Sequence, residues 1–284
     1  MIINAVTARR SWHDVLIKKE NKKMKKRILA LAAVSALTFA LCGCSAKKAD
    51  GDLAYVQGNG KLVVGITDFE PMDYKDANGK WIGFDAELAE KFAESIGVKA
   101  EFVEIEWDNK AMELDGKSID CVWNGMTLTD EVKSAMSTSN AYCNNAQVVV
   151  VKKDVADKYK TVESLSELRF AVESGSAGKE QAEEHKLKYT EVTSQANAVM
   201  EVAAGTSDAA IIDSLMAAAM VGEGTSYDTL TYTVSLNSEE YGVGFRKDSN
   251  LTEKLNEFLK TAYKDGTLKS IAEKYKVQAA LIAQ

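Results

Sequence analysis

Residues 119–132 constrain the fold most, because they combine an apolar strand, a glycine-containing turn and the start of a helix. Ile119 and Val122 give the strand its apolar character, and Gly125 allows a close backbone turn. Thr129 precedes two acidic residues, which is a helix start signal. Backbone donors and acceptors of such a connection can meet a small ligand, although an ordinary strand-to-helix turn has the same local pattern.

The same alternation of strands and helices continues along the chain. The expected strands cover residues 62–67, 102–105, 147–151, 169–173, 207–213 and 241–245. The expected helices cover residues 84–96, 108–114, 195–204, 215–221, 251–262 and 268–275, with Asp108 as one cap and Ser164 with Glu167 as a capping box. This alternation predicts an α/β fold of two units with parallel or mostly parallel sheets, each covered on both faces.

The amino-terminal residues do not belong to this fold. A basic stretch, residues 25–27, precedes a 14-residue apolar run, residues 28–41. The run is too short to span a bilayer comfortably, and its charged, apolar and small-residue order is that of a secretory signal. We expect Met24 to be the start, residues 1–23 to be an upstream extension, and residues 24–43 to be the signal peptide.

The end of this signal resembles the lipobox of bacterial lipoproteins. Leu41 lies three residues before Cys44, with Gly43 between them, although Cys42 stands where a small residue such as alanine is usual. The resemblance implies a mature chain that is lipidated at Cys44 and held at the outer face of the cell membrane. Residues 44–59 are of low complexity and fit a tether to the folded part.

The net charge and the small number of cysteines and histidines limit the classes of function that the chain can have. Residues 1–43 hold nine of the 35 basic and two of the 42 acidic residues, so the mature chain carries about 14 excess negative charges. An exported acidic protein is a poor nucleic-acid binder.

Cys121 and Cys143 could form a disulfide or remain two buried thiols. With only His13 and His185, no histidine metal site or histidine-activated nucleophile is supported, and we expect no cofactor and no metal.

Three motifs in order resemble the polar amino-acid binding proteins of bacterial ABC importers (family 3): residues 83–88, 124–129 and 241–246. The resemblance covers about residues 60–276. It implies the type II periplasmic-binding-protein-like fold, with lobe 1 at residues 53–143 plus 243–284, lobe 2 at 146–240, and two crossing hinge segments. It also implies a monomer that traps an amino acid or related amine and delivers it to an ABC permease and its ATPase.

The resemblance further implies a ligand site. Phe69 and Trp107 would sandwich the ligand, the Gly125 carbonyl and Thr127 hydroxyl would take its α-amino and α-carboxylate groups, and Asp213 would bind an ammonium. The start of a helix at Ser176 would receive a carboxylate. The full implied set is Asp68, Phe69, Trp107, Asn124, Gly125, Met126, Thr127, Val132, Glu173, Ser176, Ala177 and Asp213. Trp123 should point to the opposite face of its strand and lie in the core.

Departures from the family pattern bear on the ligand. Val132 replaces the arginine that clamps the α-carboxylate, and Lys133 is rotated from that position by about 100°. Glu173 stands where a polar or basic residue is common, and Ala177 where threonine is common. These changes should make the cleft favour cationic groups. We expect a basic or neutral amino acid held mainly at Ser176, or an amine between the two aromatic rings.

Two other functions fit parts of the pattern. An enzyme of the cyclohexadienyl dehydratase kind would use Glu173 as a general acid or base, because a buried carboxylate can have a raised pKa. No paired acid/base set or metal cluster supports it, and a lipid anchor suits delivery to a permease better. The sensing module of a receptor would need a membrane-spanning helix and a signalling domain. We therefore expect a binding protein and not an enzyme.

Overall fold

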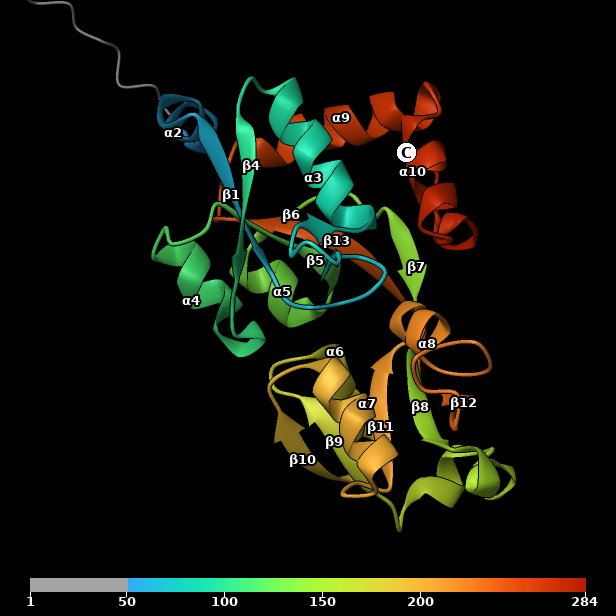
Figure 1. Cartoon of the computed structure of the whole chain (residues 1–284). Coiled ribbons are helices and arrows are strands. Elements are labelled where there is room, and N and C mark those ends of the chain that lie inside the picture. Colours follow the sequence, from blue (N-terminus) through green and yellow to red (C-terminus); the bar gives the residue numbers. More distant parts are fainter. Residues whose placement is uncertain (1–50) are drawn as a thin grey trace, which may run out of the picture. The chain divides into compact units, whose positions relative to one another are not determined.

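The computed structural model describes residues 51–284, so the expectations for the signal peptide and for lipidation at Cys44 lie outside the described residues. Residues 51–284 form two mixed β-sheets with helices on both faces of each (Figure 1). We call the first sheet with its helices lobe 1 and the second lobe 2. None of the helices in the described part of the chain is long and apolar enough to cross a membrane.

The sheet of lobe 1 has the strand order β4-β1-β5-β13-β6, and β7 also pairs with β13. Its strands are β1 (Lys61–Ile66), β4 (Lys99–Glu104), β5 (Cys121–Thr127), β6 (Ser137–Thr138), β7 (Cys143–Asn145) and β13 (Glu239–Phe245). A small hairpin joins β2 (Tyr74–Lys75) to β3 (Trp81–Ile82). Strands β4, β1 and β5 are parallel, whereas β13 runs antiparallel to its neighbours. The expectation of mostly parallel sheets is therefore corrected to mixed sheets.

Apolar residues that alternate along the strands place helices on both faces of this sheet. The helices of lobe 1 are α2 (Asp52–Asn59), α3 (Phe84–Ser95), η1 (Trp107–Asn109), α4 (Lys110–Asp115), α5 (Asp130–Ala135), α9 (Leu251–Lys264), α10 (Thr267–Lys274) and η4 (Gln278–Ala280). Val64 and Trp123 belong to a core cluster with residues of α3, α9 and α10. Val122 and Met126 belong to another cluster with residues of α4 and α5.

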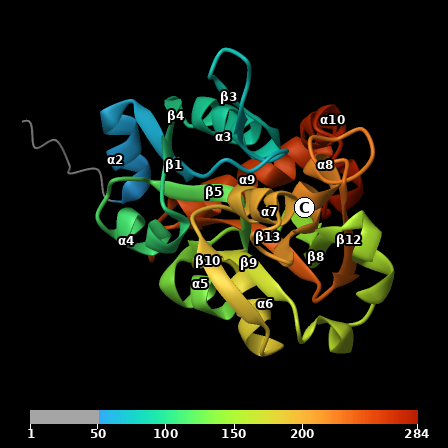
Figure 2. The ribbon, with the colours of Figure 1, turned by 60° about the horizontal axis from the view of Figure 1, so that its bottom comes forward.

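Lobe 2 repeats this construction. Its sheet has the order β10-β9-β11-β8-β12, formed by β8 (Gln147–Lys152), β9 (Arg169–Glu173), β10 (Lys188–Val192), β11 (Ala209–Asp213) and β12 (Leu230–Ser235). Its helices are η2 (Lys153–Lys158), η3 (Val162–Leu165), α6 (Ala177–Glu184), α7 (Gln195–Ala204) and α8 (Ser214–Met220). Val148 and Val150 cluster with α7 and α8, whereas Val149 and Val151 cluster with α6, so the sheet is covered on both faces (Figure 2).

The chain crosses between the lobes twice. The first crossing leads from β7 into β8, and the second leads from β12 into β13. Glu239 and Glu240 pair with Asn145 and Asn144, so β13 begins beside β7. The family resemblance implies a lobe 2 that extends to residue 240, whereas these pairings place Glu239 and Glu240 in the sheet of lobe 1.

Local features differ from the sequence expectations at four places. Asp52–Asn59 form helix α2 with Val56 fully buried, so the expected tether cannot extend to residue 59. The helix at 108–114 begins as η1 and has no side-chain cap from Asp108. The capping box near 164 joins Thr161 to Ser164 and does not use Glu167. Residues 124–127 continue strand β5, so the expected turn is absent.

Candidate functional site

A cavity of about 210 Å³ lies where strand ends and helix starts of both lobes meet. Eleven of the twelve residues implied by the sequence line it. Asp68 does not line it, because this residue is exposed to solvent beyond the end of β1. Lobe 1 contributes the end of β5 and the starts of α4 and α5, and lobe 2 contributes the ends of β9 and β11 and the start of α6. These are the positions where open α/β sheets collect ligand sites.

Gly125 forms a bulge in β5 that shapes the lobe 1 wall. The pairing of β5 with β13 shifts register at this point, and Gly125 has a positive φ of 54°. A Cβ atom there would lie 2.6 Å from Phe69 Cε1. The Gly125 N–H donates to Asp85 Oδ2 at 2.6 Å, and the Tyr142 hydroxyl donates to the same oxygen at 2.7 Å. Burial raises the pKa of Asp85 to about 7, against the lowering effect of these two donors.

Asn124 connects β5 to the end of β1 and has little capacity left for a ligand. Its Oδ1 accepts from the Thr67 N–H at 2.8 Å and from the Thr67 hydroxyl at 2.6 Å. Its Nδ2 donates to the Thr67 carbonyl at 3.1 Å and to Asp73 Oδ2 at 2.8 Å. Because both hydrogens of the amide are used, Asn124 acts by holding the wall of the cavity in place.

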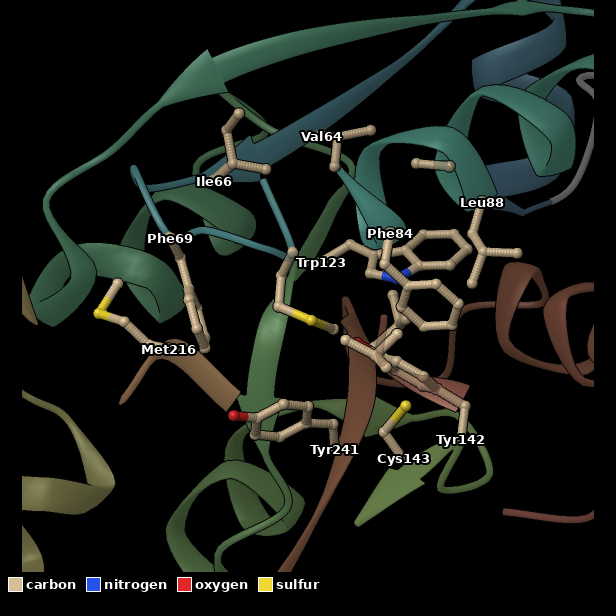
Figure 3. Packing of buried hydrophobic residues seen from close by; sticks show 14 of the residues in the cluster. Val64, Ile66, Phe69, Phe84, Leu88, Trp123, Tyr142, Cys143, Met216 and Tyr241 are labelled. Atoms are coloured by element: carbon tan, nitrogen blue, oxygen red, sulfur yellow. The ribbon is translucent and has the colours of Figure 1, made fainter. Parts of the chain in front are cut away.

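The two aromatic residues both line the cavity. Phe69 is 2% exposed and meets Tyr241 edge to face, with ring centroids 6.3 Å apart (Figure 3). Trp107 is 8% exposed, and the Lys110 ammonium lies 4.9 Å from its ring centroid. The core assignment of Trp123 is confirmed, because it is fully buried with its ring centroid 6.1 Å from that of Phe92.

The Thr127 hydroxyl is engaged elsewhere. It donates to Glu239 Oε1 at 2.9 Å, at the second chain crossing. A hydroxyl has one hydrogen to donate, so a ligand carboxylate would have to compete with Glu239 for it. This contact weakens the expectation, drawn from the family resemblance, that Thr127 holds the α-carboxylate.

The start of α6 forms part of the lobe 2 wall. Ser176 caps this helix by accepting from the Lys179 N–H at 3.2 Å, while its hydroxyl donates to the Glu173 carbonyl at 2.8 Å. The N–H of Ala177 lies in the first turn, where no helix carbonyl precedes it, and Ala177 lines the cavity. An anion can therefore be received here by backbone N–H groups and the helix dipole.

Asp213 lines the cavity and accepts hydrogen bonds from several side chains. Asn145 and Gln195 side-chain amides donate to it, Gln147 Nε2 donates at 3.0 Å, and the Tyr241 hydroxyl donates at 2.7 Å. Burial and the nearby Glu239 carboxylate raise the pKa of Asp213 to about 7, although the donors lower it. Both chain crossings thus contribute donors to one cavity-lining carboxylate.

Glu173 is a buried carboxyl group of the cavity lining that has an unpartnered oxygen. It is 3% exposed, and its Oε1 atom has no hydrogen-bond partner among the residues that the structure describes. Burial and the nearby Asp213 raise its pKa to about 8, whereas Lys110 and Gln195 lower it. The lining holds six acidic residues against two lysines, so a cationic group is electrostatically favoured.

Several lining residues were not foreseen from the sequence, and two of them, Lys110 and Gln195, make contacts that shape the site. Lys110 stands at the start of α4, three residues after Trp107, and its ammonium donates to the Gly175 carbonyl of lobe 2 at 2.9 Å. Gln195 starts α7 and binds Asp213 with both its amide nitrogen and its carbonyl oxygen. A basic residue just after a site tryptophan was the available signal for Lys110. No local signal connects Gln195 with Asp213.

The two cysteines of the described part, Cys121 and Cys143, are free and buried. Of the two alternatives that the sequence left open, the structure shows thiols. Burial raises the pKa of both thiols well above the ordinary value, so neither resembles a reactive thiolate.

Similar proteins have the same architecture. The sequence model described as bacterial extracellular solute-binding proteins, family 3, matches residues 62–278. The arginine-binding extracellular protein ArtP of Bacillus subtilis (strain 168) is 32% identical over 264 residues, which are 89% of this chain and 98% of that protein. A solved structure of a mutant of ArgBP from T. maritima has a TM-score of 0.74 at 32% identity, over 79% of this chain and 98% of that chain.

A second solved structure bears on the enzyme alternative. It is the ancestral amino acid-binding protein AncCDT-1, a precursor of cyclohexadienyl dehydratase, with a TM-score of 0.72 at 35% identity. The alignment covers 78% of this chain and 98% of that chain. The likeness is thus to a binding protein from which an enzyme was derived.

Proposed function

The chain belongs to the bacterial extracellular solute-binding proteins of family 3, and we propose that it captures a cationic amino acid or a related amine and delivers it to an ABC importer. The ligand would lie in the cavity between the lobes and hold them closed by contacts that only the bound form makes. The permease and its ATPase would then distinguish loaded from empty protein by shape. ArtP of Bacillus subtilis, which is named for arginine binding, supports a basic ligand.

The structural observation that most supports a cationic ligand is the environment of Glu173. Its carboxyl group is buried in the lining with one oxygen unpartnered, and its ionised form would be an unpaired buried charge, which is costly in the empty site. A ligand ammonium or guanidinium would supply the missing partner. Asp213 lies close enough to raise the pKa of Glu173, so the same cation would relieve the repulsion between the two carboxylates.

The proposal includes export and attachment to the membrane. A signal peptide at residues 24–43 and lipid on Cys44 would place the folded part at the outer face of the membrane. The connection would run from residue 44 to the start of α2 at Asp52. Mass spectrometry of the protein from its natural membrane would show acyl chains on an N-terminal Cys44, and an unmodified N-terminus would contradict this part.

The ligand can be tested directly. We would identify small molecules that co-purify with residues 45–284 by mass spectrometry, and then measure binding by calorimetry. The panel would contain arginine, lysine, neutral amino acids, glutamate and polyamines. We expect arginine, lysine or an amine to bind most tightly. Tight glutamate binding without binding of any cation would refute the proposal.

The same preparation tests the enzyme alternative. The raised pKa of Glu173, about 8, is a property that a general acid needs at neutral pH. For a binding protein we expect no turnover of cyclohexadienyl compounds by the wild type. Turnover that is lost in Glu173→Gln would instead favour the dehydratase.

A further inference from the structure

The cavity has valine at position 132, where the family resemblance implies an arginine that binds the ligand carboxylate. Val132, at the position of the expected clamp, is 6% exposed and lies in the apolar cluster of Met126 and Met136. Thr127, the expected hydroxyl donor of lobe 1, is hydrogen-bonded to Glu239. If the ligand is an amino acid, its carboxylate therefore needs a different cation.

Two lysines line the cavity, and they differ in their partners. Lys179 lies 3.5 Å from Glu183 Oε1 and 3.8 Å from Glu191 Oε1, so its charge is already paired. Lys110 forms no salt bridge within 4.0 Å to any carboxylate of residues 51–284. Within the described residues, its ammonium donates to two carbonyl oxygens, those of Trp107 at 3.3 Å and Gly175 at 2.9 Å. An ammonium has three hydrogens, so one remains for an anion.

The Lys110 ammonium lies beside a second feature that can bind an anion, the start of α6. Gly175 directly precedes Ser176, the cap of α6, and the N–H of Ala177 is free of helix partners in the first turn. The hydrogen bond to the Gly175 carbonyl therefore holds Lys110 of lobe 1 beside the start of the lobe 2 helix. A carboxylate at this point would meet an ammonium from one lobe and backbone N–H groups from the other.

We propose that Lys110 receives the α-carboxylate of the ligand, together with the start of α6, and replaces the arginine absent at Val132. The cationic end of the ligand then faces Glu173 and Asp213. The site recognises both charges of an amino acid, and it prefers an amino acid to the amine formed by removing its carboxylate. This inference rests on the proposed binding of a basic ligand and specifies which group meets its anionic end.

The rival explanation is that Lys110 only connects the lobes. Its hydrogen bond to Gly175 crosses between them, so its loss would weaken the closed form for every ligand alike. A pair of ligands that differ only in the carboxylate separates the two explanations. Arginine and agmatine are such a pair, and lysine and cadaverine are a second.

The experiment measures both pairs by calorimetry against the wild type, Lys110→Met, Lys110→Arg and the control Lys133→Met. Lys133 is exposed on α5 and does not line this cavity. We expect Lys110→Met to weaken arginine binding roughly 10-fold to 100-fold, the range of one charge-assisted hydrogen bond, and agmatine binding less than about 3-fold. Lys110→Arg should retain most of the preference for arginine, and Lys133→Met should leave both affinities unchanged.

Three results would overturn the inference. Equal losses for arginine and agmatine in Lys110→Met would show that Lys110 acts only between the lobes. A wild type that binds agmatine as tightly as arginine would show that no carboxylate is recognised. A wild type that binds none of the four ligands would refute the proposed function itself, and the inference with it. Circular dichroism of each variant confirms that the compared proteins are folded.

Discussion

The affinity for a guanidinium ligand should rise with pH, because the proposed site binds the cation with ionised Glu173. The pKa of Glu173 in the empty site is raised to about 8 by burial and by Asp213. Ligand binding to the carboxylate therefore has to release a proton below that pH. Each pH unit below the pKa costs about 1.4 kcal/mol of binding free energy, while the guanidinium stays charged throughout.

The magnitude follows from the ionised fraction. With a pKa of about 8, Glu173 is half ionised at pH 8, whereas at pH 6 only about one molecule in a hundred has it ionised. Titration of Glu173 alone should then make the dissociation constant for arginine about 50-fold higher at pH 6 than at pH 8, and any contribution from Asp213 adds to it. In Glu173→Gln this component is absent, and titration of Asp213, with a pKa of about 7, leaves at most about a 10-fold dependence.

Calorimetry at pH 6, 7 and 8 tests the predicted pH dependence of arginine binding. Two buffers with different ionisation enthalpies give the number of protons released on binding, which should be about one from Glu173 at pH 6. At pH 8 the Gln variant should bind roughly 10-fold to 100-fold more weakly than the wild type, because a charge-assisted hydrogen bond is lost. A wild-type affinity that is constant with pH, or higher at pH 6, would refute the reasoning.

Three further predictions concern single substitutions. Glu173→Gln should stabilise the ligand-free protein by roughly 3 kcal/mol at pH 7, because folding raises the pKa of Glu173 from 4.5 to about 8 and wild-type stability therefore falls as pH rises through that window. Urea unfolding at pH 5 and 7 should show that the stability gained by the variant over the wild type grows with pH. Gly125→Ala should lower the free energy of unfolding by roughly 1–3 kcal/mol and should also lower ligand affinity. The new Cβ would lie 2.6 Å from Phe69 Cε1, on a residue with a positive φ. An unchanged dissociation constant would contradict the role of the bulge in shaping the cavity. Val132→Arg should strengthen binding of neutral α-amino acids in calorimetry, and no change would mean that the carboxylate does not lie near α5.

Much of the fold could be predicted from sequence where local signals agree. The bounds of Arg169–Glu173 and Gln195–Ala204 match the structure, because apolar periodicity coincides there with capping or turn residues. Gly125 was read as a turn, since a glycine between apolar residues favours one. Only the pairing of β5 with β13, more than a hundred residues later in the chain, shows that the strand continues through a bulge.

The sequence predicted part of the cavity lining, but it did not predict the partners of the lining residues. Motif positions brought eleven of the twelve implied residues to the cavity. Lys110 was missed because its placement depends on the Gly175 carbonyl, 65 residues away in the other lobe. Likewise, the engagement of Thr127 depends on Glu239, 112 residues later. Contacts of this range follow from how the two lobes meet, which no local sequence pattern encodes.

The hydrogen bonds of Asp213 connect the ligand cavity with both chain crossings. It forms part of the cavity, yet its donors include Asn145 and Gln147 at the first chain crossing and Tyr241 just after the second. Glu239 shares two of these donors, so any change in charge at Asp213 redistributes hydrogen bonds at both crossings. Under the proposed closure of the lobes, a substitution of Asp213 that changes the preferred ligand should also change the rate at which the ligand is released, because both depend on the same hydrogen bonds.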